Sequence, residues 1–207
     1  MVILTLILVG SYILGSIPVG YLAGQLAGVE IRKLGSGNVG ATNVVRVLGK
    51  KYGYPVFALD FLKGLGAVKI SMLIATGPPP EWNSPEMFGI AAAISCVVGH
   101  SYPLWLKFKG GKGVATSAGA LFALTSIGGL IGLAIWIVIF RLTRYVSLAS
   151  VTAAVVLPIV ILVISCRNKD AKAIFYFSIC VAAIVIWRHR SNLSRLVRGT
   201  EPRFSRK

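Results

Sequence analysis

Long stretches without a charged residue constrain this chain more than any other feature. Of its 207 residues 56% are hydrophobic and 14% are charged, whereas soluble domains carry about 25% charged residues. The uncharged stretches are residues 1–29, 70–80, 87–106, 113–140, 145–166 and 173–187. About 20 apolar helical residues cross a bilayer core. The sequence therefore predicts an all-α integral membrane protein and excludes a soluble enzyme or a disordered tail.

One of these stretches decides how many transmembrane helices there are. We expect helices near 2–24, 54–77, 86–106, 145–165 and 171–188. As a single helix, the stretch 113–140 would be about 42 Å long, well beyond the thickness of the hydrocarbon core. Gly128-Gly129 marks the expected break near its middle. A break there gives two short helices and seven spans in total.

The distribution of basic residues favours seven spans over six. With seven spans and the N-terminus outside, 17 Lys and Arg face the cytoplasm, and only Arg167, Lys169 and Lys172 lie outside. With six spans the division is 11 to 9. The positive-inside rule therefore predicts seven transmembrane helices with a cytoplasmic C-terminus. Arg32 and Lys33 follow the first span rather than precede it, so a secretory signal is not expected. Residues 1–207 are expected to form a single membrane-embedded domain.

The formal net charge of +16 points to anionic partners. Because most of the chain is too apolar to offer a wet groove, we expect anionic lipid or anionic substrates and no nucleic acid. Cys96, Cys166 and Cys180 form no CxxC pair, so we expect small buried side chains rather than a disulfide or a metal site. No metal and no cofactor is expected.

Glycine, asparagine, serine and basic residues gather in segments predicted to face the cytoplasm. These segments are residues 35–46, 99–116, 144–150 and 188–201. Glycines let backbone N–H groups approach an anion closely. Arg46 and Lys112 add charge, and the guanidinium fork of Arg46 fits a phosphate. The pattern favours a phosphate site between helices; the alternative is small-residue helix packing beside ordinary positive loops.

Two familiar nucleotide-binding motifs do not explain these loops. Residues 35–40 match the G-x-G-x-x-G dinucleotide fingerprint, but they follow a membrane helix instead of a strand. Residues 110–113 are similar to a P-loop, but Lys112 precedes glycine rather than Ser or Thr.

Together, the segments resemble the acyl-phosphate:glycerol-3-phosphate acyltransferase (PlsY) family of bacterial membranes. The first loop resembles its GSGNxGATNxxR block, the second GHxxPxxxxFxGGKGVAT, and the tail RHxxNIxRLxxGxE, with Leu193 where isoleucine is more usual. The stretches 60–64 and 144–150 are also similar to the family. The resemblance runs from the first span to Glu201.

The resemblance implies a seven-span enzyme of the bacterial inner membrane with its active site on the cytoplasmic face. Its reaction would transfer a fatty acyl group from acyl phosphate to the 1-hydroxyl of glycerol 3-phosphate, giving 1-acylglycerol 3-phosphate and phosphate. The implied partners are both substrates, membrane lipid and the enzyme that supplies acyl phosphate.

Candidate site residues come from all of these segments. The candidate catalytic residues are Ser36, Arg46, Lys112, His189 and Asn192. The candidate substrate-binding residues are Gly35, Gly37, Asn38, Gly40, Thr42, Asn43, His100, Gly110, Gly111, Gly113 and Ser150.

The alcohol nucleophile of such a reaction must lose a proton. His189 has a suitable ordinary pKa, but the phosphate of glycerol 3-phosphate is a rival base that we favour, because no acid is placed by sequence to orient His189. His189 and Asn192, three residues apart on one helix face, would then hold the glycerol or its phosphate. Ser36 is not expected to form an acyl-enzyme, because an anhydride donor makes one unnecessary.

Several polar residues are expected to support the structure. Asp60 and Lys63 are one helical turn apart and should pair. His100 should cap or bridge two helices, and a His–Asp base pair is hard to build with six acids in the whole chain. Of Ser147 and Ser150, we favour Ser150 for the site. The rival functions are a transporter or flippase for organic phosphates, which usually carries its site near the midplane, and a scaffold that binds anionic lipid.

Overall fold

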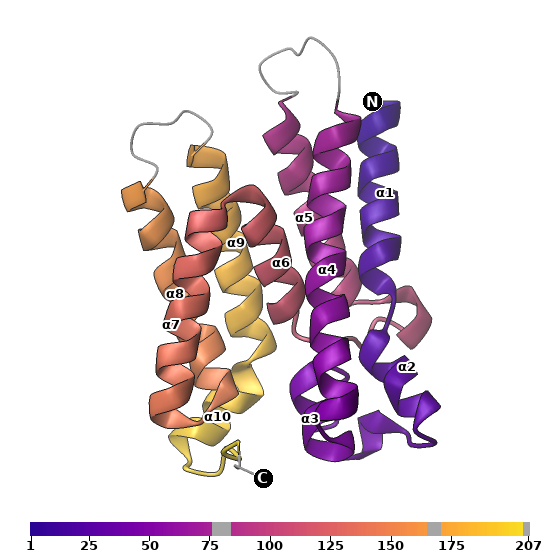
Figure 1. The fold of residues 1–207 in the computed structure, drawn as a ribbon, viewed down its shortest axis with the longest axis vertical. Coiled ribbons are helices and arrows are strands. Elements are labelled where there is room, and N and C mark those ends of the chain that lie inside the picture. Colours follow the sequence, from indigo (N-terminus) through magenta and orange to yellow (C-terminus); the bar gives the residue numbers. More distant parts are fainter. Residues whose placement is uncertain (76–83, 165–170, 205–207) are drawn as a thin grey trace. The chain divides into compact units, whose positions relative to one another are not determined.

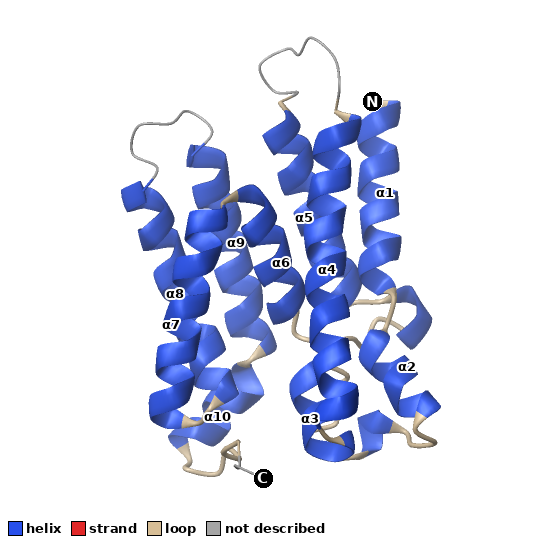
Figure 2. Ribbon diagram, in the orientation of Figure 1, coloured by secondary structure: helices blue, strands red, loops and turns tan. Residues whose placement is uncertain are grey.

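The computed structural model describes residues 1–75, 84–164 and 171–204, and every regular element in them is a helix (Figure 2). The prediction of an all-α chain is confirmed. In chain order (Figure 1) the elements are α1 Val2–Ser16, α2 Val19–Leu26, η1 Ile31–Lys33, α3 Ala41–Leu48, α4 Lys50–Ile74, α5 Pro85–Ser101, η2 Leu104–Leu106, α6 Val114–Leu124, α7 Ser126–Thr143, α8 Val146–Ile164, α9 Ala171–Arg188 and α10 Arg190–Val197.

Four stretches of the described chain are long and apolar enough to cross a membrane: Val2–Leu26, Pro85–Leu106, Ser126–Thr143 and Val146–Ile164. A fifth is counted if α9 and α10, which meet at an angle of 60°, form one span. Seven spans and the orientation of the termini therefore stay predictions. Arg167 and Lys169, which entered the charge count, lie outside the described residues, as does Cys166.

The stretch 113–140 does form two helices, but the predicted break at Gly128-Gly129 is wrong. The helix ends at Leu124 and resumes at Ser126. Thr125 is extended, and its Oγ1 accepts a hydrogen bond from Gly128 N at 3.3 Å. Threonine is a favoured N-cap because its side chain satisfies a free N–H of the first turn. The glycines therefore belong to the first turn of α7 instead of interrupting a helix.

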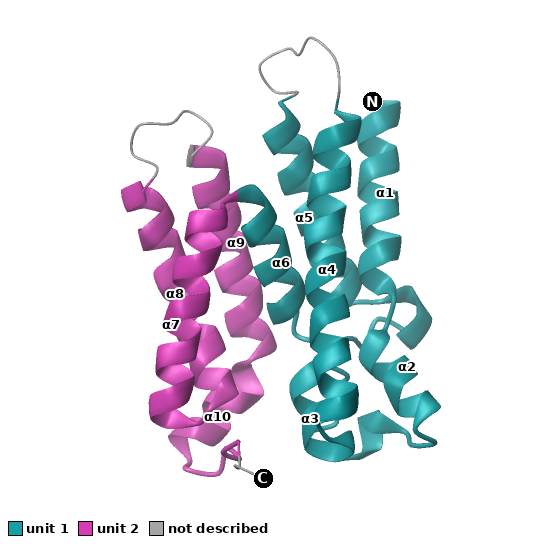
Figure 3. Cartoon of the chain, viewed as in Figure 1, with its two compact units in different colours: residues 1–124 teal, residues 125–207 magenta. Residues whose placement is uncertain are grey.

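The contacts within the chain divide it into two compact units, Met1–Leu124 and Thr125–Lys207 (Figure 3). The single domain stays a prediction. In the first unit α1, α4 and α5 run side by side, and α6 packs on α4 (Figure 1). A Cβ at Gly15 would overlap the backbone of Cys96, and one at Gly64 the carbonyl of Thr116. Glycine thus allows the helix backbones to approach closely.

A break between α1 and α2 begins the part of the first unit that carries the first glycine loop. It falls at Ile17-Pro18, where proline cannot supply a backbone donor. Beyond it, α2, η1, α3 and the start of α4 enclose a small apolar core; its buried members are Ala23, Ile31, Val39, Val44, Val56 and Leu106. This core anchors both ends of the loop that joins η1 to α3.

The second unit consists of α7, α8, α9 and α10. The helix α8 packs against both α7 and α9. Leu157 and Ile161 of α8 are buried, as are Phe177 and Val185 of α9. Most large apolar side chains of α7 are exposed instead, as expected for a helix that faces lipid.

Candidate active site

The first glycine loop is a tight turn held by one asparagine. Gly35 and Gly37 have φ values of 60° and 71°, a region that side chains other than glycine rarely occupy. Between them, Ser36 N donates to Asn43 Oδ1 at 2.8 Å. Asn43 is 1% exposed, and its Nδ2 donates to the carbonyls of Leu34 at 3.0 Å and Ile31 at 3.4 Å. Asn43 therefore shapes the loop with both ends of its amide.

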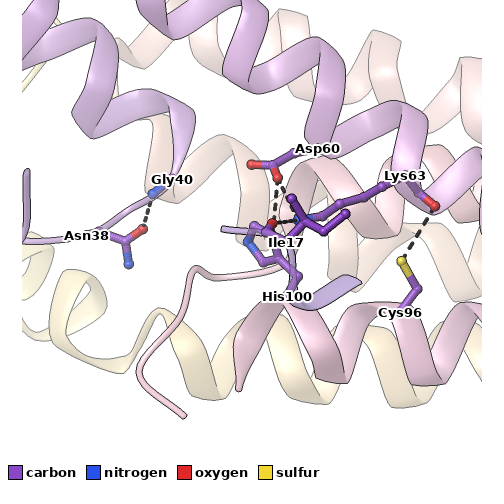
Figure 4. A network of polar contacts seen from close by, with 7 residues as sticks. All are labelled: Ile17, Asn38, Gly40, Asp60, Lys63, Cys96 and His100. Carbon is purple, nitrogen blue, oxygen red and sulfur yellow. Dashed lines mark hydrogen bonds and ion pairs between the residues drawn. The ribbon is translucent and has the colours of Figure 1, made fainter. Parts of the chain in front are cut away.

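A second asparagine directs the loop into α3. Asn38 Oδ1 accepts a hydrogen bond from Gly40 N at 2.8 Å (Figure 4), and Gly40 is the residue that precedes the helix. The amide oxygens of Asn38 and Asn43 are thus used within the protein. A direct role of either side chain in substrate binding stays a prediction.

Three polar side chains of this loop make no hydrogen bond or ion pair with any residue in the described ranges: Ser36, Thr42 and Arg46. Ser36 and Arg46 are exposed and Thr42 is half-buried. Thr42 and Arg46 are four residues apart on α3 and so share one face of the helix. A guanidinium and two hydroxyls beside a tight glycine turn are suited to bind a phosphate.

The second glycine loop is folded back onto the end of α5. Gly110 N donates to Ser101 O at 3.2 Å, and Gly111 N to His100 O at 3.1 Å. A Cβ at Gly110 would overlap the His100 carbonyl and Pro103, so only glycine allows the chain to pass this close. Gly113, with φ of 77°, then leads into α6. The half-buried Lys112 lies between these glycines and makes contacts of its own.

Buried charges lie next to this loop. Lys63 Nζ lies 2.8 Å from Asp60 Oδ1, which confirms the predicted pair, and also donates to Ile17 O at 3.1 Å (Figure 4). His100 Nδ1 lies 3.4 Å from the same Asp60 oxygen, so His100 bridges α5 and α4 as expected. This contact joins two consecutive helices and is not the His–Asp base pair that six acids make hard to build, because Lys63 shares the carboxylate. Cys96 Sγ donates to Lys63 O at 3.6 Å.

A small cavity borders the same residues within the first unit. Its lining includes Ser16 and Ile17 from the α1–α2 break, Val39 from the first glycine loop, and Asp60 and His100. It has room for about one water molecule. The two glycine loops of the first unit therefore approach a common polar centre.

In the second unit His189 lies at the bend between α9 and α10. Its side chain is buried, with the residue 3% exposed, and Nδ1 lies 2.8 Å from Val185 O. Because a carbonyl only accepts, this bond places the proton on Nδ1 and leaves Nε2 as an acceptor in the neutral ring. The backbone carbonyl of Val185 thus orients the imidazole. From the sequence, no acid could be assigned to this role.

Asn192 belongs to a hydrogen-bonded cluster around Glu201. Glu201 Oε1 accepts from Asn192 Nδ2 at 2.7 Å and from Ser147 Oγ at 2.8 Å, and Oε2 accepts from Arg195 Nε at 2.8 Å. Burial alone would raise the pKa of the Glu201 carboxyl, but the hydrogen bonds from Asn192, Ser147 and Arg195 together hold this pKa below its usual range. The carboxylate therefore fixes Asn192 on α10 to the start of α8.

Sequence reasoning overlooked this role of Glu201, and between Ser147 and Ser150 it favoured Ser150 for the site. Ser147 lies beside Asn192, whereas Ser150 Oγ accepts from Trp136 Nε1 at 3.1 Å and donates to Val146 O at 2.8 Å. Substrate binding by Ser150 stays a prediction. A signal was present: Glu201 is the single acid of residues 171–207, a segment rich in arginine.

Comparison with known proteins supports the family that the glycine-loop motifs resemble. The model of the family described as glycerol-3-phosphate acyltransferase matches residues 5–199. The chain belongs to the glycerol-3-phosphate acyltransferase family. A family member from Desulforamulus reducens is 42% identical over 203 residues, covering 98% of this chain and 96% of the relative. Another, from Synechococcus elongatus, is 45% identical over 200 residues, covering 95% and 92%.

Solved structures of the family are similar as well. The chain is 39% identical to PlsY (YgiH), an integral membrane glycerol 3-phosphate acyltransferase. Against its glycerol 3-phosphate form the TM-score is 0.86, with 98% of this chain and 96% of that chain covered. Against its lysophosphatidic acid form the TM-score is 0.83, with 98% and 95% covered. The resemblance to the PlsY family is thereby confirmed.

Proposed function

We propose that this acyltransferase moves a fatty acyl group from acyl phosphate to the 1-hydroxyl of glycerol 3-phosphate, releasing 1-acylglycerol 3-phosphate and inorganic phosphate. The observation that carries the proposal is the family match over residues 5–199, together with relatives that bear the name of this acceptor. Arg46, Ser36 and Thr42 lie beside the first glycine turn and make no hydrogen bond or ion pair with other described residues, so they support the proposal by offering a phosphate its ligands.

Acyl phosphate is the donor that the residues favour. Acyltransferases of other classes use a His-x4-Asp pair, but the Asp position is occupied by Trp105 after His100 and by Ser194 after His189. The Asp60–His100 pair does not replace it, because Lys63 shares the carboxylate and the far edge of the imidazole lies against Gly111. An anhydride whose leaving group is phosphate needs little acid catalysis, so such a pair is unnecessary.

The chemistry requires two phosphate groups to be held close together. Arg46 and Lys112 supply the positive charges, and the backbone N–H groups of the glycine loops supply hydrogen bonds in a poorly hydrated site. His189 and Asn192 hold the glycerol moiety or its phosphate. The phosphate of glycerol 3-phosphate acts as the base that takes the proton from the attacking hydroxyl, so no acyl-enzyme forms on Ser36.

The active site faces the cytoplasm of a bacterial inner membrane in this proposal, because the basic glycine loops belong on the positive side. Soluble glycerol 3-phosphate is then reached from the cytosol, while the acyl chain is supplied from the bilayer. The enzyme that makes acyl phosphate is a partner on the same side.

The test is a donor comparison with purified protein in detergent. Glycerol 3-phosphate is offered with acyl phosphate, acyl-CoA or acyl carrier protein, and phosphate release and lysophosphatidate are measured. Acyl phosphate alone should support turnover, with one phosphate released per acyl group transferred. Equal or faster turnover with acyl-CoA would overturn the donor assignment. Uptake of organic phosphate into vesicles without acyl transfer would favour a transporter.

A further inference from the structure

The buried carboxylate of Asp60 on α4 has two partners, Lys63 and His100, although one cation would be enough to balance its charge. The residue is 2% exposed, and its Oδ1 lies 2.8 Å from Lys63 Nζ and 3.4 Å from His100 Nδ1 (Figure 4). A buried carboxylate is tolerated where it is paired, and Lys63 alone provides that pairing. The approach of His100 therefore requires a separate explanation.

The opposite edge of the His100 ring lies against the second glycine loop. A Cβ on Gly111 would overlap Nε2 and the neighbouring ring carbons of His100. Gly111 N also donates to the His100 carbonyl at 3.1 Å. The ring is thus held between the Asp60 carboxylate on one edge and the loop backbone on the other.

We propose that His100 is a positioning residue: Asp60 fixes its imidazole through Nδ1, and the Nε2 edge sets the backbone path of Gly110–Lys112. The inference rests on the proposed function, in which this loop binds a substrate phosphate. His100 itself need not touch the substrate. Lys63, through its bond to Ile17 O, ties the same carboxylate to the α1–α2 break beside the first glycine loop.

A double-mutant cycle between His100 and Gly111 tests the proposal. Gly111→Ala should raise the KM for glycerol 3-phosphate more than it lowers kcat, because the new Cβ pushes the loop away from the ring. In a His100→Ala background the ring is gone, and Gly111→Ala should then cost less. The coupling expected for two groups in direct contact is about 2- to 150-fold. His100→Asn, which truncates the ring but keeps a donor for Asp60, replaces His100→Ala if that variant fails to fold.

Gly110 provides the matched control. A Cβ there would overlap the His100 carbonyl and Pro103, not the imidazole. Removing the His100 side chain should therefore leave the cost of Gly110→Ala unchanged. Coupling at Gly111 with none at Gly110 supports the proposal. If Gly111→Ala raises the KM equally with and without the imidazole, the proposal is overturned. Equal coupling at both glycines would also overturn it, because general destabilisation of the protein would produce that result.

The role of Asp60 is tested in the same way. The reference here is Lys63→Met, because Asp60→Asn would otherwise leave a buried ammonium unpaired. In that reference Asp60→Asn should raise the KM for glycerol 3-phosphate, and it should have no further effect when His100 is also alanine. Additive effects of Asp60 and His100 would show that the carboxylate does not act through the ring.

The same cycles are also measured as Kd for glycerol 3-phosphate by calorimetry, which requires no acyl donor. If wild-type protein binds glycerol 3-phosphate but transfers no acyl group, the proposed function fails while the cycle still decides the positioning role. If it binds none, the loop is no phosphate site and both fail.

Discussion

Glu201→Ala should strongly destabilise the second unit, because it removes the acceptor shared by two buried donors. Ser147 Oγ and Asn192 Nδ2 both donate to Oε1 at 2.8 and 2.7 Å. Leaving a buried donor unsatisfied costs about 1–3 kcal/mol, so the two together cost about 2–6 kcal/mol. The bond from Arg195, whose side chain is 38% exposed, adds at most about 1 kcal/mol because water screens it.

Thermal unfolding in detergent measures this loss, and acyl transfer measures its consequence for Asn192. Glu201→Gln keeps an oxygen acceptor without the charge and should be less destabilised than Glu201→Ala. Glu30→Ala is the matched control, because it breaks an exposed ion pair with Arg32 and should leave the unfolding midpoint nearly unchanged. An unfolding midpoint for Glu201→Ala equal to that of wild type would refute the assignment of Glu201 as the link between α10 and α8.

Three further outcomes are expected. Asn43→Ala should cost about 1–3 kcal/mol of stability by unfolding assay, because buried loop groups lose their partner, and should abolish most acyl transfer; wild-type values would contradict the role of Asn43. The pKa of Glu201 is lowered in the folded protein, so its contribution to stability is complete above the unfolded Glu pKa of about 4.3 and is lost as the pH falls through the lower folded pKa. Glu201→Gln should remove this part of the acid dependence, and an unchanged pH profile of unfolding would argue against this role of Glu201. Ser36→Cys, in a background without native cysteines, should not be labelled by an impermeant thiol reagent in intact cells and should be labelled once the inner face is opened. Labelling in intact cells would contradict the predicted orientation.

The local pattern of the sequence was sufficient to predict contacts within one helix. Asp60 and Lys63 are one turn apart, so their pairing follows from helical spacing alone. The glycines of the first loop were expected to let backbone N–H groups approach an anion, and the structure adds that Gly35 and Gly37 form a turn with positive φ. Such features depend on neighbours in the chain, which the sequence displays directly.

Contacts between distant segments could not be predicted in this way. Ser147 and Glu201 are separated by 54 residues, and nothing in the spacing of Ser147 and Ser150 shows which one faces α10. His100 and Asp60 meet because α4 and α5 pack together. At the α6–α7 break, the glycine pair Gly128-Gly129 led to the wrong predicted position. The break lies at Thr125, whose side-chain hydroxyl caps the first turn of α7.

The most direct measurement of the central claim is kcat/KM for glycerol 3-phosphate, with acyl phosphate as donor, in Arg46→Ala and Lys51→Ala proteins. A charge-assisted bond to phosphate is worth about 1.5–3 kcal/mol, which predicts a loss of about 10- to 150-fold for Arg46→Ala. Lys51→Ala removes an equal charge from an exposed position in the first turn of α4 and should be nearly silent. A folded Arg46→Ala protein with kcat/KM close to that of wild type would contradict a phosphate site at the first glycine loop.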